Sequence, residues 1–583
     1  MTATQAGPAP AATEAWRDAA NRDIAVLRDH AGEWARLPIR RRIELLEGLR
    51  DRTAAIAPRW VALALAAKGL RPDAPAAGEE WTAGPWALLF ALNRLRETLL
   101  SLEKHGRVRL RGGSVRTREG GQVVVDVFPQ STYDRLLLSG VSAEVWMQPG
   151  VTVANLAENM AAFYRQDRPE GAVALVLGAG NVASIAPLDV LHKLYAEGQV
   201  CLLKMNPVND YLGPVFEEVF AELVAAGWLR TVYGGPEVGA FLVAHQGIDE
   251  IHMTGSDRTH DAIVFGAGPD GEERKRSGRP LIAKRITSEL GNVSPTIVVP
   301  GPWDDADLRF QAAHIATQKL HNGGFNCIAA QVLVLPGGWE PGPRLLDQVA
   351  AVMAAQPARP AYYPGAAERR RRLAERHPDA LVLEAGDAAR TLIAGLDSAD
   401  AGEVCYSTEA FASVLAATTI AAPDPATFLM DAVDFANTRL SGTLGANIIV
   451  HPATIRELGP RLEEAIARLR YGCVGVNVWT GVGYLLAQTP WGAFPGHTLE
   501  NIGSGIGFVH NTLLFDRPQK SVVRAPFYPF PRGVRHGQVA MLPHPPWFVT
   551  NPRADQIGRR LVEFEADPSP LRLPGIFAQA LRA

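Results

Sequence analysis

Residues 172–207 read AVALVLGAGNVASIAPLDVLHKLYAEGQVCLLKMNP, and this stretch decides the fold class. AVALVLG is an apolar run that predicts a buried strand, SIAPLDVLHKLYAEG has helical spacing, and QVCLLKMNP is again an apolar strand. Strand–helix–strand alternation with nearly continuous apolar strands is typical of a parallel sheet that is covered by helices on both faces. The sequence therefore predicts an α/β core that begins near residue 171.

The alternation continues beyond this unit. Residues 214–256 predict a helix, a strand, a second helix and a short strand that ends in IHMTGS. A second α/β pattern follows, with a helix over 306–324 that ends in glycines and an apolar strand over 329–338. Upstream, residues 13–70 have helical spacing, whereas residues 107–153 read as strands broken by glycine and proline.

Three segments stand apart from this pattern. Residues 1–14 are rich in alanine, proline and threonine, and we expect a short disordered tail there. The glycine- and charge-rich stretch 266–279 predicts a solvated loop. Residues 517–583 hold 11 of the 43 prolines, so we expect this C-terminal extension to run over the surface or across a subunit boundary and not to form a packed core.

Composition excludes several classes of protein. Of the 583 residues, 47% are hydrophobic and 20% are charged, which allows a large buried core. The net charge of -3 gives no basic footprint for nucleic acid. No apolar run approaches the length of a membrane span, and the N-terminus has no secretory signal pattern. Four well-separated cysteines form no CxxC motif, so we expect a reducing, cytoplasmic location.

The glycines that follow the first predicted strand, in residues 172–207, match a known dinucleotide-binding pattern. Gly178-Ala-Gly180-Asn-Val-Ala183 follows a strand and opens a helix, and it fits the GxGxxA fingerprint that binds a dinucleotide pyrophosphate. That fingerprint expects an acidic ribose ligand at the end of the next strand, where this chain has Lys204. A lone match of this kind is weak, so other roles for these glycines stay open.

Several further motifs follow one another along the chain, and both the motifs and their order resemble those of the aldehyde dehydrogenase superfamily over roughly residues 30–510. HMTGSD resembles its FTGS turn, SELGNVSPTIVV its ELGG segment, NGGFNCIAAQVLV its cysteine segment and EAFASV its ExFGPV motif. YGCVGVN and PWGAF resemble two later motifs of the family. The resemblance implies an α/β fold with a Rossmann-type nucleotide-binding domain, an α/β catalytic domain and a small β arm for oligomerisation.

On this basis we expect five segments. They are a tail over 1–14, a nucleotide-binding domain over 15–287 with arm strands within 107–153, a catalytic domain over 288–480, a return and oligomerisation segment over 481–516, and the extension over 517–583.

The resemblance also implies catalytic roles. Cys327 is the expected nucleophile that attacks an aldehyde carbon, because a thiolate can form a thioester that water later cleaves. Glu289 is the expected general base that activates this water. The side-chain amide of Asn181, together with the backbone N–H of Cys327, is expected to hold the developing oxyanion. In that case the neighbouring glycines shape the active-site turn and do not hold pyrophosphate.

The implied cofactor is NAD or NADP. Lys204 is expected to bind the adenosine ribose, and Gly255 and Ser256 open a helix whose N-terminus suits a phosphate. Glu409 and Phe411 are expected at the nicotinamide ribose and ring. NAD-preferring members of the family carry glutamate where this chain has Pro207, so both cofactors remain open. The histidines show no metal-ligand spacing, and we expect no metal site.

The expected activity is oxidation of a small-molecule aldehyde to a carboxylic acid by a cytoplasmic homodimer or homotetramer. One alternative is a CoA-acylating aldehyde dehydrogenase, favoured by Pro207 and by the altered turn at 178–184 but opposed by Glu289. The other is a catalytically degenerate scaffold. Phe325, His321 and Trp479 flank the motifs, and they line a substrate tunnel or pack in the core.

Overall fold

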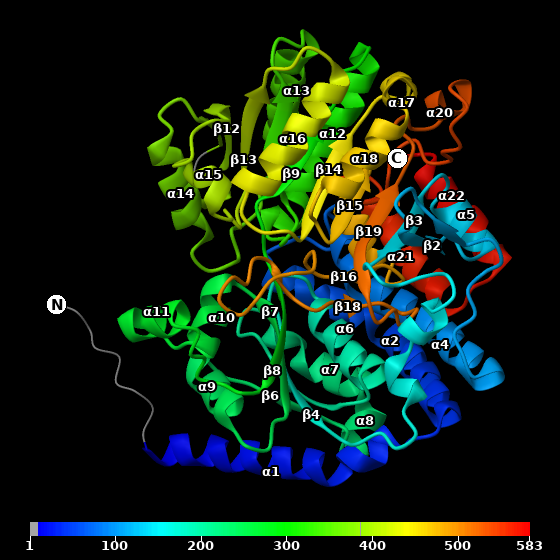
Figure 1. Ribbon diagram of the computed structural model, residues 1–583, viewed down its shortest axis with the longest axis vertical. Coiled ribbons are helices and arrows are strands. Elements are labelled where there is room, and N and C mark those ends of the chain that lie inside the picture. The colour runs from blue at the N-terminus through cyan, green and yellow to red at the C-terminus, as the bar shows by residue number, and fades with distance from the viewer. Residues whose placement is uncertain (1–9, 385) are drawn as a thin grey trace.

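The computed structural model describes residues 10–384 and 386–583, which build two large sheets with helices around them (Figure 1). The smaller sheet has the order β17-β8-β7-β4-β5-β6, in which β4 to β8 run parallel and β17 is antiparallel. Its strands are β4 (Val173–Leu177), β5 (Val200–Lys204), β6 (Leu229–Val232), β7 (Glu250–Gly255), β8 (Arg285–Leu290) and β17 (Gly505–Ile506). The parallel core predicted from residue 171 onward is confirmed.

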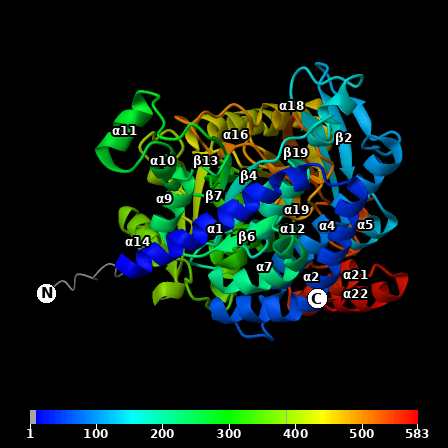
Figure 2. The same ribbon diagram turned by 90° about the horizontal axis from the view of Figure 1, so that it is seen from below.

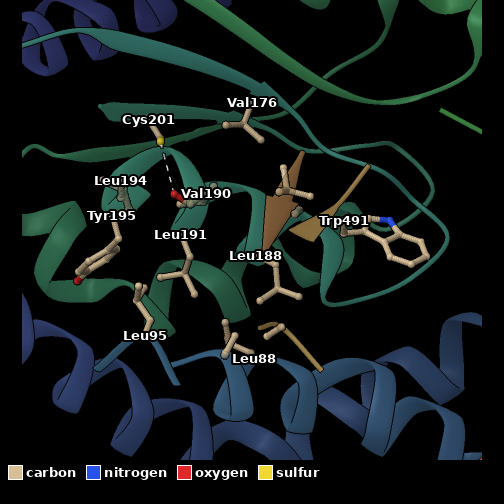
Figure 3. Close-up of a cluster of buried hydrophobic side chains, with 14 of the residues drawn as sticks. Leu88, Leu95, Val176, Leu188, Val190, Leu191, Leu194, Tyr195, Cys201 and Trp491 are labelled. Atoms are coloured by element: carbon tan, nitrogen blue, oxygen red, sulfur yellow. Dashed lines mark hydrogen bonds between the residues drawn. The ribbon is translucent and has the colours of Figure 1, made fainter. Parts of the chain in front are cut away.

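Helices cover both faces of this sheet. They are α6 (Ile185–Leu191), the π-helix η4 (His192–Ala196), α7 (Gly213–Val219), α8 (Ala221–Ala225), α9 (Pro236–Ala244) and α10 (Asp257–Val264). Leu188 and Leu191 of α6 lie among apolar side chains that include Leu88 and Leu95 of α4 (Ala87–His105), so α6 is packed between the sheet and the N-terminal helices (Figure 3). The other N-terminal helical segments are α1 (Pro10–Ala35), α2 (Ile39–Ala67), α3 (Ala77–Trp81) and η1 (Thr82–Trp86).

The larger sheet has the order β1-β2-β3-β19-β15-β14-β9-β10-β13-β12-β11. Its parallel centre consists of β9 (Ser294–Val298), β10 (Ala330–Pro336), β12 (Arg390–Asp397), β13 (Val414–Ile420), β14 (Gly445–Ile449) and β15 (Cys473–Val476), with β11 (Leu381–Leu383) at one edge. Around it lie α12 (Asp305–Leu320), α13 (Pro341–Ala355), α14 (Ala366–Arg376), α15 (Val404–Ser407), α16 (Pro425–Arg439), α17 (Pro452–Leu458) and α18 (Pro460–Arg468).

The predicted arm strands are β1 (Val115–Thr117), β2 (Val123–Phe128) and β3 (Ser142–Met147). They join the larger sheet through β19 (Pro518–Arg524), which pairs antiparallel with β3 and parallel with β15. The start of the predicted surface extension is therefore a central strand. The high proline content of the tail as a whole masked this strand, although Val522 and Val523 are fully buried.

The rest of the tail also packs against the body of the protein. Its helices are α20 (Arg532–Arg535), α21 (Ala554–Ala566) and α22 (Leu573–Ala580). Figures 1 and 2 show α21 beside the N-terminal helices α2 and α4, and α22 packs against α21. The contact is close, because a Cβ added at Gly78 of α3 would lie 2.4 Å from the Ala554 carbonyl carbon, and Ile557 and Phe564 are buried. The expectation that residues 517–583 run over the surface and form no packed core is wrong for β19 and α21, which pack inside the protein.

Two other local predictions differ from the structure. Residues 268–276 of the predicted loop form helix α11 (Gly268–Arg276), which has a proline in its first turn and three basic residues in its last turn. Both features favour a helix, since proline starts helices well and cations stabilise their C-termini. Helix α1 begins at Pro10, inside the tail expected over 1–14, and residues 1–9 of that tail lie outside the described residues.

Within the described residues, no helix combines the length and apolar character that a membrane span requires.

The close packing of α21 on α3 yields a stability prediction. Replacing Gly78 with alanine places a methyl group against the Ala554 backbone, and overpacking of this kind costs about 1–3 kcal/mol. We expect the free energy of unfolding of Gly78→Ala, measured in urea, to fall by that amount. Gly112→Ala is the matched control, because a Cβ there meets nothing within 4 Å. Equal stability of the two variants would contradict the packing of the C-terminal helix on α3.

Candidate active site

One large cavity of about 1680 Å³ is lined by residues of both sheets. All eight residues predicted for catalysis and cofactor binding line it. They are Asn181, Lys204, Gly255, Ser256, Glu289, Cys327, Glu409 and Phe411. These residues are spread over more than 200 positions of the chain, and the fold brings them to a single cavity as the sequence predicted.

A glycine turn presents Cys327 to the cavity. After α12 the backbone passes through Asn322 at φ 54°, Gly323 at φ 66° and Gly324 at φ 84°, all in the left-handed region. A Cβ at Gly324 would lie 2.8 Å from the Ala412 carbonyl oxygen, so no other residue fits there without a shift. The predicted tight turn is therefore present before Cys327, which is partly exposed to the cavity.

Glu289 and the thiol of Cys327 both line the cavity, and each shifts the pKa of the other. Glu289 lies on β8 opposite Thr254 of β7, and only 3% of its surface is exposed. Burial is the main cause that raises the pKa of Glu289 to about 8; the Cys327 thiol opposes this shift and the Asp189 carboxylate adds to it. Burial, followed by the charges of Glu289 and Glu409, raises the pKa of the Cys327 thiol well above its ordinary value. At neutral pH both groups hold protons, so a thiolate forms only when a base accepts the thiol proton.

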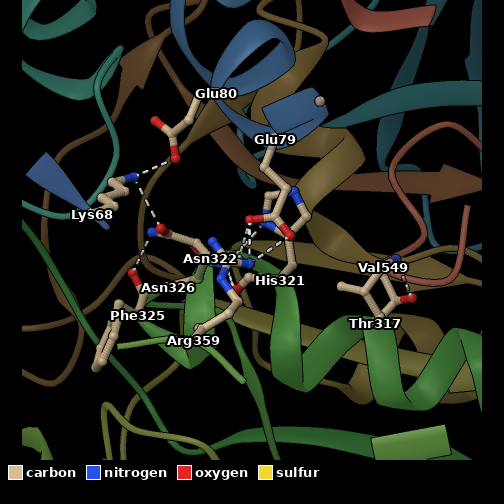
Figure 4. Close-up of polar contacts among 12 residues, drawn as sticks. Lys68, Glu79, Glu80, Thr317, His321, Asn322, Phe325, Asn326, Arg359 and Val549 are labelled. Carbon is tan, nitrogen blue, oxygen red and sulfur yellow. Dashed lines mark hydrogen bonds and ion pairs between the residues drawn. The ribbon is translucent and has the colours of Figure 1, made fainter. Parts of the chain in front are cut away.

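A buried polar network that the sequence did not reveal holds the glycine turn (Figure 4). Glu79 accepts a hydrogen bond from the Asn322 backbone N–H at 2.9 Å and pairs with Arg359 at 2.7 Å. Lys68 donates to Asn322 Oδ1 at 3.0 Å and pairs with Glu80 at 2.6 Å. Each buried charge thus has an opposite partner. The network fixes the one non-glycine residue of the turn in its left-handed conformation.

Asn181 contacts the same loop. Its side-chain Nδ2 donates to the Phe325 carbonyl at 2.9 Å, which leaves one amide hydrogen for another acceptor. The glycines beside it have a packing role: the Gly178 N–H donates to the Lys204 carbonyl at 3.1 Å, and a Cβ at Gly180 would lie 2.7 Å from Asn206 Oδ1. Both glycines thus allow the turn after β4 to pack on the turn after β5. This explains the GxGxxA pattern without a pyrophosphate.

The far part of the cavity suits a nucleotide. Lys204 ends β5 beside Pro207, which also lines the cavity. Burial lowers the pKa of Lys204, while Glu237 and Asp210 oppose that shift. Gly255 ends β7, and Ser256 is the N-cap of α10, where its hydroxyl accepts a hydrogen bond from the Thr259 N–H at 3.2 Å. A helix N-terminus at a cavity wall is a favourable place for phosphate.

Glu409 and Phe411 lie across the cavity on the catalytic domain. Burial raises the pKa of Glu409 to about 8, and the charge of Lys319 opposes this shift. Among the described residues its Oε1 atom is buried with no hydrogen-bond partner, as expected of a carboxylate that accepts from a bound hydroxyl. A Cβ at Gly291 would lie 2.0 Å from Glu409 Oε2, so the glycine at this position makes room for the carboxylate. Phe411 packs edge-on against Tyr363 at a centroid distance of 4.8 Å.

The three aromatic residues that flank the motifs are packed in the core. The His321 and Trp479 rings lie 5.0 Å apart, and Trp479 donates to the Ile328 carbonyl at 3.1 Å. Phe325 is buried against Tyr362 and Phe411. Of the two interpretations open for these residues, the structure supports core packing.

Three possible metal ligands also meet outside the cavity. His377, Glu403 and Cys405 place ligand atoms within 4.8 Å of one another. Glu403 caps α15 by accepting from the Cys405 N–H at 2.7 Å, and it contacts His377 at 3.2 Å. These contacts account for the cluster without an ion.

This combination of parts defines the aldehyde dehydrogenase fold: a parallel nucleotide-binding sheet and a second parallel sheet that together place a cysteine and a glutamate in one cavity. Residues 141–376 match the model of the aldehyde dehydrogenase family. In addition, 169 residues are 30% identical to the N-succinylglutamate 5-semialdehyde dehydrogenase of Sphingopyxis alaskensis, over 29% of this chain and 32% of that protein. The aldehyde dehydrogenase LUC3 of Fusarium sp is 29% identical over 173 residues, which are 29% of this chain and 34% of that protein. The matches thus span about a third of the length of these curated relatives.

Solved structures share the fold over most of the chain. The NAD-dependent aldehyde dehydrogenase from Sinorhizobium meliloti gives a TM-score of 0.58 at 19% identity, over 87% of this chain and 86% of that chain. The NADP-dependent glyceraldehyde-3-phosphate dehydrogenase from Bacillus halodurans C-125, complexed with NADP, gives 0.58 at 19% identity, over 87% and 91%. The predicted fold class and the resemblance to the aldehyde dehydrogenase superfamily are therefore confirmed.

The Cys327–Glu289 pair predicts how thiol reactivity depends on pH. Because the pKa of Glu289 is about 8, its carboxylate fraction rises roughly tenfold per pH unit below pH 8 and then levels off. We expect the rate of Cys327 alkylation by neutral iodoacetamide to follow this step, since the carboxylate accepts the thiol proton.

In Glu289→Gln the step near pH 8 should disappear and leave only the later rise of the thiol itself. Peptide mass spectrometry identifies the modified cysteine, and Cys327→Ala is the control for labelling of the three buried cysteines. An unchanged step in Glu289→Gln would show that Glu289 is not the base for Cys327.

Proposed function

We propose that this chain oxidises a small-molecule aldehyde to a carboxylic acid with NAD or NADP. The observation that carries the proposal is that Cys327 and Glu289, whose pKa values depend on each other, line one cavity that also reaches Lys204 and the N-terminus of α10. The names of the sequence relatives, which include a semialdehyde dehydrogenase, support an aldehyde substrate.

In the proposed mechanism, Glu289 takes the proton of the Cys327 thiol, and the thiolate attacks the aldehyde carbon to give a thiohemiacetal. The second amide hydrogen of Asn181 and the backbone N–H of Cys327 stabilise the oxyanion, a contribution of about 2.7–4 kcal/mol per donor. A nicotinamide nucleotide bound at this cavity would accept a hydride from the thiohemiacetal carbon, which would leave Cys327 in a thioester. Glu289 releases the thiol proton and then removes a proton from water, which attacks the thioester. As the acid leaves, the Cys327 thiolate takes this proton from Glu289 and becomes a thiol again.

Several residues fit the nucleotide in this proposal. Lys204 would hold a ribose, the N-terminus of α10 after Ser256 a phosphate, and the unpartnered Glu409 Oε1 a second ribose hydroxyl. Phe411 would pack against the nicotinamide ring. Pro207 offers no side-chain acceptor for a ribose 2′-hydroxyl, and this keeps NADP as well as NAD possible.

The alternative of a CoA-acylating enzyme rests on Pro207 and on the turn over 178–184, which departs from the usual sequence of the family. The position of Glu289 in the same cavity as Cys327 favours the hydrolytic reaction, because it provides a base near the place where the thioester would form. We also propose a homodimer or homotetramer in the cytoplasm. The three-residue edge strand β1 (Val115–Thr117) offers unpaired backbone groups through which a second copy can extend the sheet.

The first experiment tests the reaction directly. Purified protein is mixed with a panel of aldehydes and NAD or NADP, with and without CoA, and absorbance of the reduced cofactor is followed. We expect turnover without CoA, no turnover in Cys327→Ala, and a loss of about 10²–10⁴-fold in the hydrolytic step of Glu289→Gln.

Turnover only with CoA would establish the acylating alternative and remove the role of Glu289 in hydrolysis. Failure of every combination, together with a Cys327 that does not react with iodoacetamide, would favour the scaffold.

Cofactor preference gives a further prediction. In Pro207→Glu a carboxylate at the cavity wall accepts from a 2′-hydroxyl and repels a 2′-phosphate. We expect the ratio of kcat/KM for NAD to that for NADP to rise by about tenfold, which corresponds to about 1.4 kcal/mol. Pro207→Gln is the uncharged control and should shift the ratio less. A ratio that does not change in Pro207→Glu would place the ribose away from this wall.

A further inference from the structure

Glu289 needs a route by which protons leave. The proposed reaction, on which this inference rests, gives Glu289 one proton when the thiol ionises and another when water attacks the thioester. The side chain of Glu289 is buried, and its opening to solvent is the cavity that cofactor and substrate would fill. Filled active sites exclude water, so a base that works there needs another exit for its protons.

A polar ladder leads away from Glu289 along one face of the smaller sheet. The pairs Thr254–Glu289, His252–Thr287 and Glu250–Arg285 lie directly opposite each other on β7 and β8. Because alternate residues of a strand point to the same face, the three pairs form successive rungs about 6.6 Å apart. The ladder therefore runs about 13 Å from the catalytic base to the solvent-exposed Arg285.

The helical segment α6–η4 supplies a polar partner to each rung. Asp189 accepts from the Thr254 hydroxyl at 2.9 Å and lies 3.5 Å from His252 Nε2 through the same carboxylate oxygen. At the outer end, Lys193 contacts Glu250 at 3.5 Å, and Glu197 pairs with Arg285 at 2.8 Å. His192 contacts Glu197 at 3.4 Å, and its pKa is also affected by the charge of His252 in the middle of the ladder.

Several buried atoms of the ladder have no partner among the described residues. They are Glu289 Oε1, Asp189 Oδ1, His252 Nε2 and His192 Nδ1, and the neighbouring His510 adds its Nε2. Asp189 is 1% exposed and His252 is 2% exposed, and buried polar atoms of this kind are normally satisfied by ordered water. A series of titratable groups with open hydrogen-bonding positions between them is an arrangement that carries protons.

We propose that this ladder is a proton path from Glu289 to solvent, separate from the cofactor cavity, in which Asp189 and His252 are positioning residues that connect Glu289 to His192. None of Asp189, His252 and His192 lines the cofactor cavity. Each transfer passes one proton from an acid to a neighbouring base, so no bond other than those to hydrogen changes.

Charged and titratable side chains from several elements surround Asp189 and His192. Asp189 faces Glu289, Tyr484 of α19 (Thr480–Leu485), and His510 of β18 (Val509–His510). His192 faces Glu197, Lys193 and His252; burial lowers its pKa, and the hydrogen bond to Glu197 opposes this. The neutral imidazole of His192 can thus accept a proton on Nδ1, which has no partner among the described residues. It can release a proton from Nε2, which contacts Glu197.

The first test is kinetic and uses the full-length protein with an aldehyde that it oxidises. We expect Asp189→Asn and His252→Gln to lower kcat by about tenfold, less than the loss of a group that transfers the proton directly, with KM unchanged and a larger solvent deuterium isotope effect. In His192→Ala, which opens space near the surface, added imidazole should restore kcat. The control is His314→Gln, an equally buried histidine of α12 outside the path.

A merely structural role for the ladder gives different results. It would change KM or the unfolding transition, it would leave the isotope effect as in the unmodified protein, and imidazole would not restore kcat in His192→Ala. Any of these results in place of the expected ones, or an unchanged kcat in Asp189→Asn and His252→Gln, overturns the proton path.

A second test does not depend on the proposed function. The Asp189 charge raises the pKa of Glu289, so Asp189→Asn should move the pH step of Cys327 alkylation by iodoacetamide to lower pH, while His314→Gln leaves it in place. A shifted step supports the coupling even if no aldehyde is oxidised, in which case the proposed activity fails and the connection of Asp189 to Glu289 stands. An unshifted step overturns the connection whatever the activity.

Discussion

The left-handed turn over Asn322–Gly324 is the constraint on which the active site depends. A non-glycine residue in this conformation costs about 1–3 kcal/mol and persists only where its surroundings hold it. Here the surroundings are the buried pairs Glu79–Arg359 and Lys68–Glu80, which bind the backbone and side chain of Asn322. Helix α3 supplies both Glu79 and Glu80, and Lys68 directly follows α2. The N-terminal helices therefore take part in placing the thiol beside Glu289, although they contribute no residue to the cavity wall.

Much of the fold could be predicted because its signals are local. The unit over 172–207 has apolar strands and a helix in sequence order, and the parallel sheet follows from them. Strand β19 (Pro518–Arg524) could not be recognised in the same way. It lies in a proline-rich tail, and both of its partner strands are distant in sequence. Its burial results from tertiary pairing, which overrides the average composition of the segment.

The residues of the candidate site also differ in whether a local sequence signal could reveal them. Short motifs indicated Cys327, Glu289 and Glu409, and these residues do line one cavity. The residues that support them were not predictable. Glu79 and Glu80 occur in AGEEW, which reads as an exposed helical turn, and the partner of Glu79 is 280 positions away. Asp189 likewise is a single charged residue in the otherwise apolar helix α6, and only its hydrogen bond with Thr254, which lies opposite Glu289, shows that it is near a buried base.

The position of β19 has a consequence for how the protein is made. Strands β3 (Ser142–Met147) and β15 (Cys473–Val476) are not neighbours until Pro518–Arg524 lies between them. A ribosome finishes every other strand of the larger sheet before it reaches this one. During that interval the nascent chain carries two open sheet edges with apolar faces, a state that favours aggregation and binding by chaperones. Completion of the sheet is therefore a late event of synthesis, because β19 is the strand that joins β3 to β15.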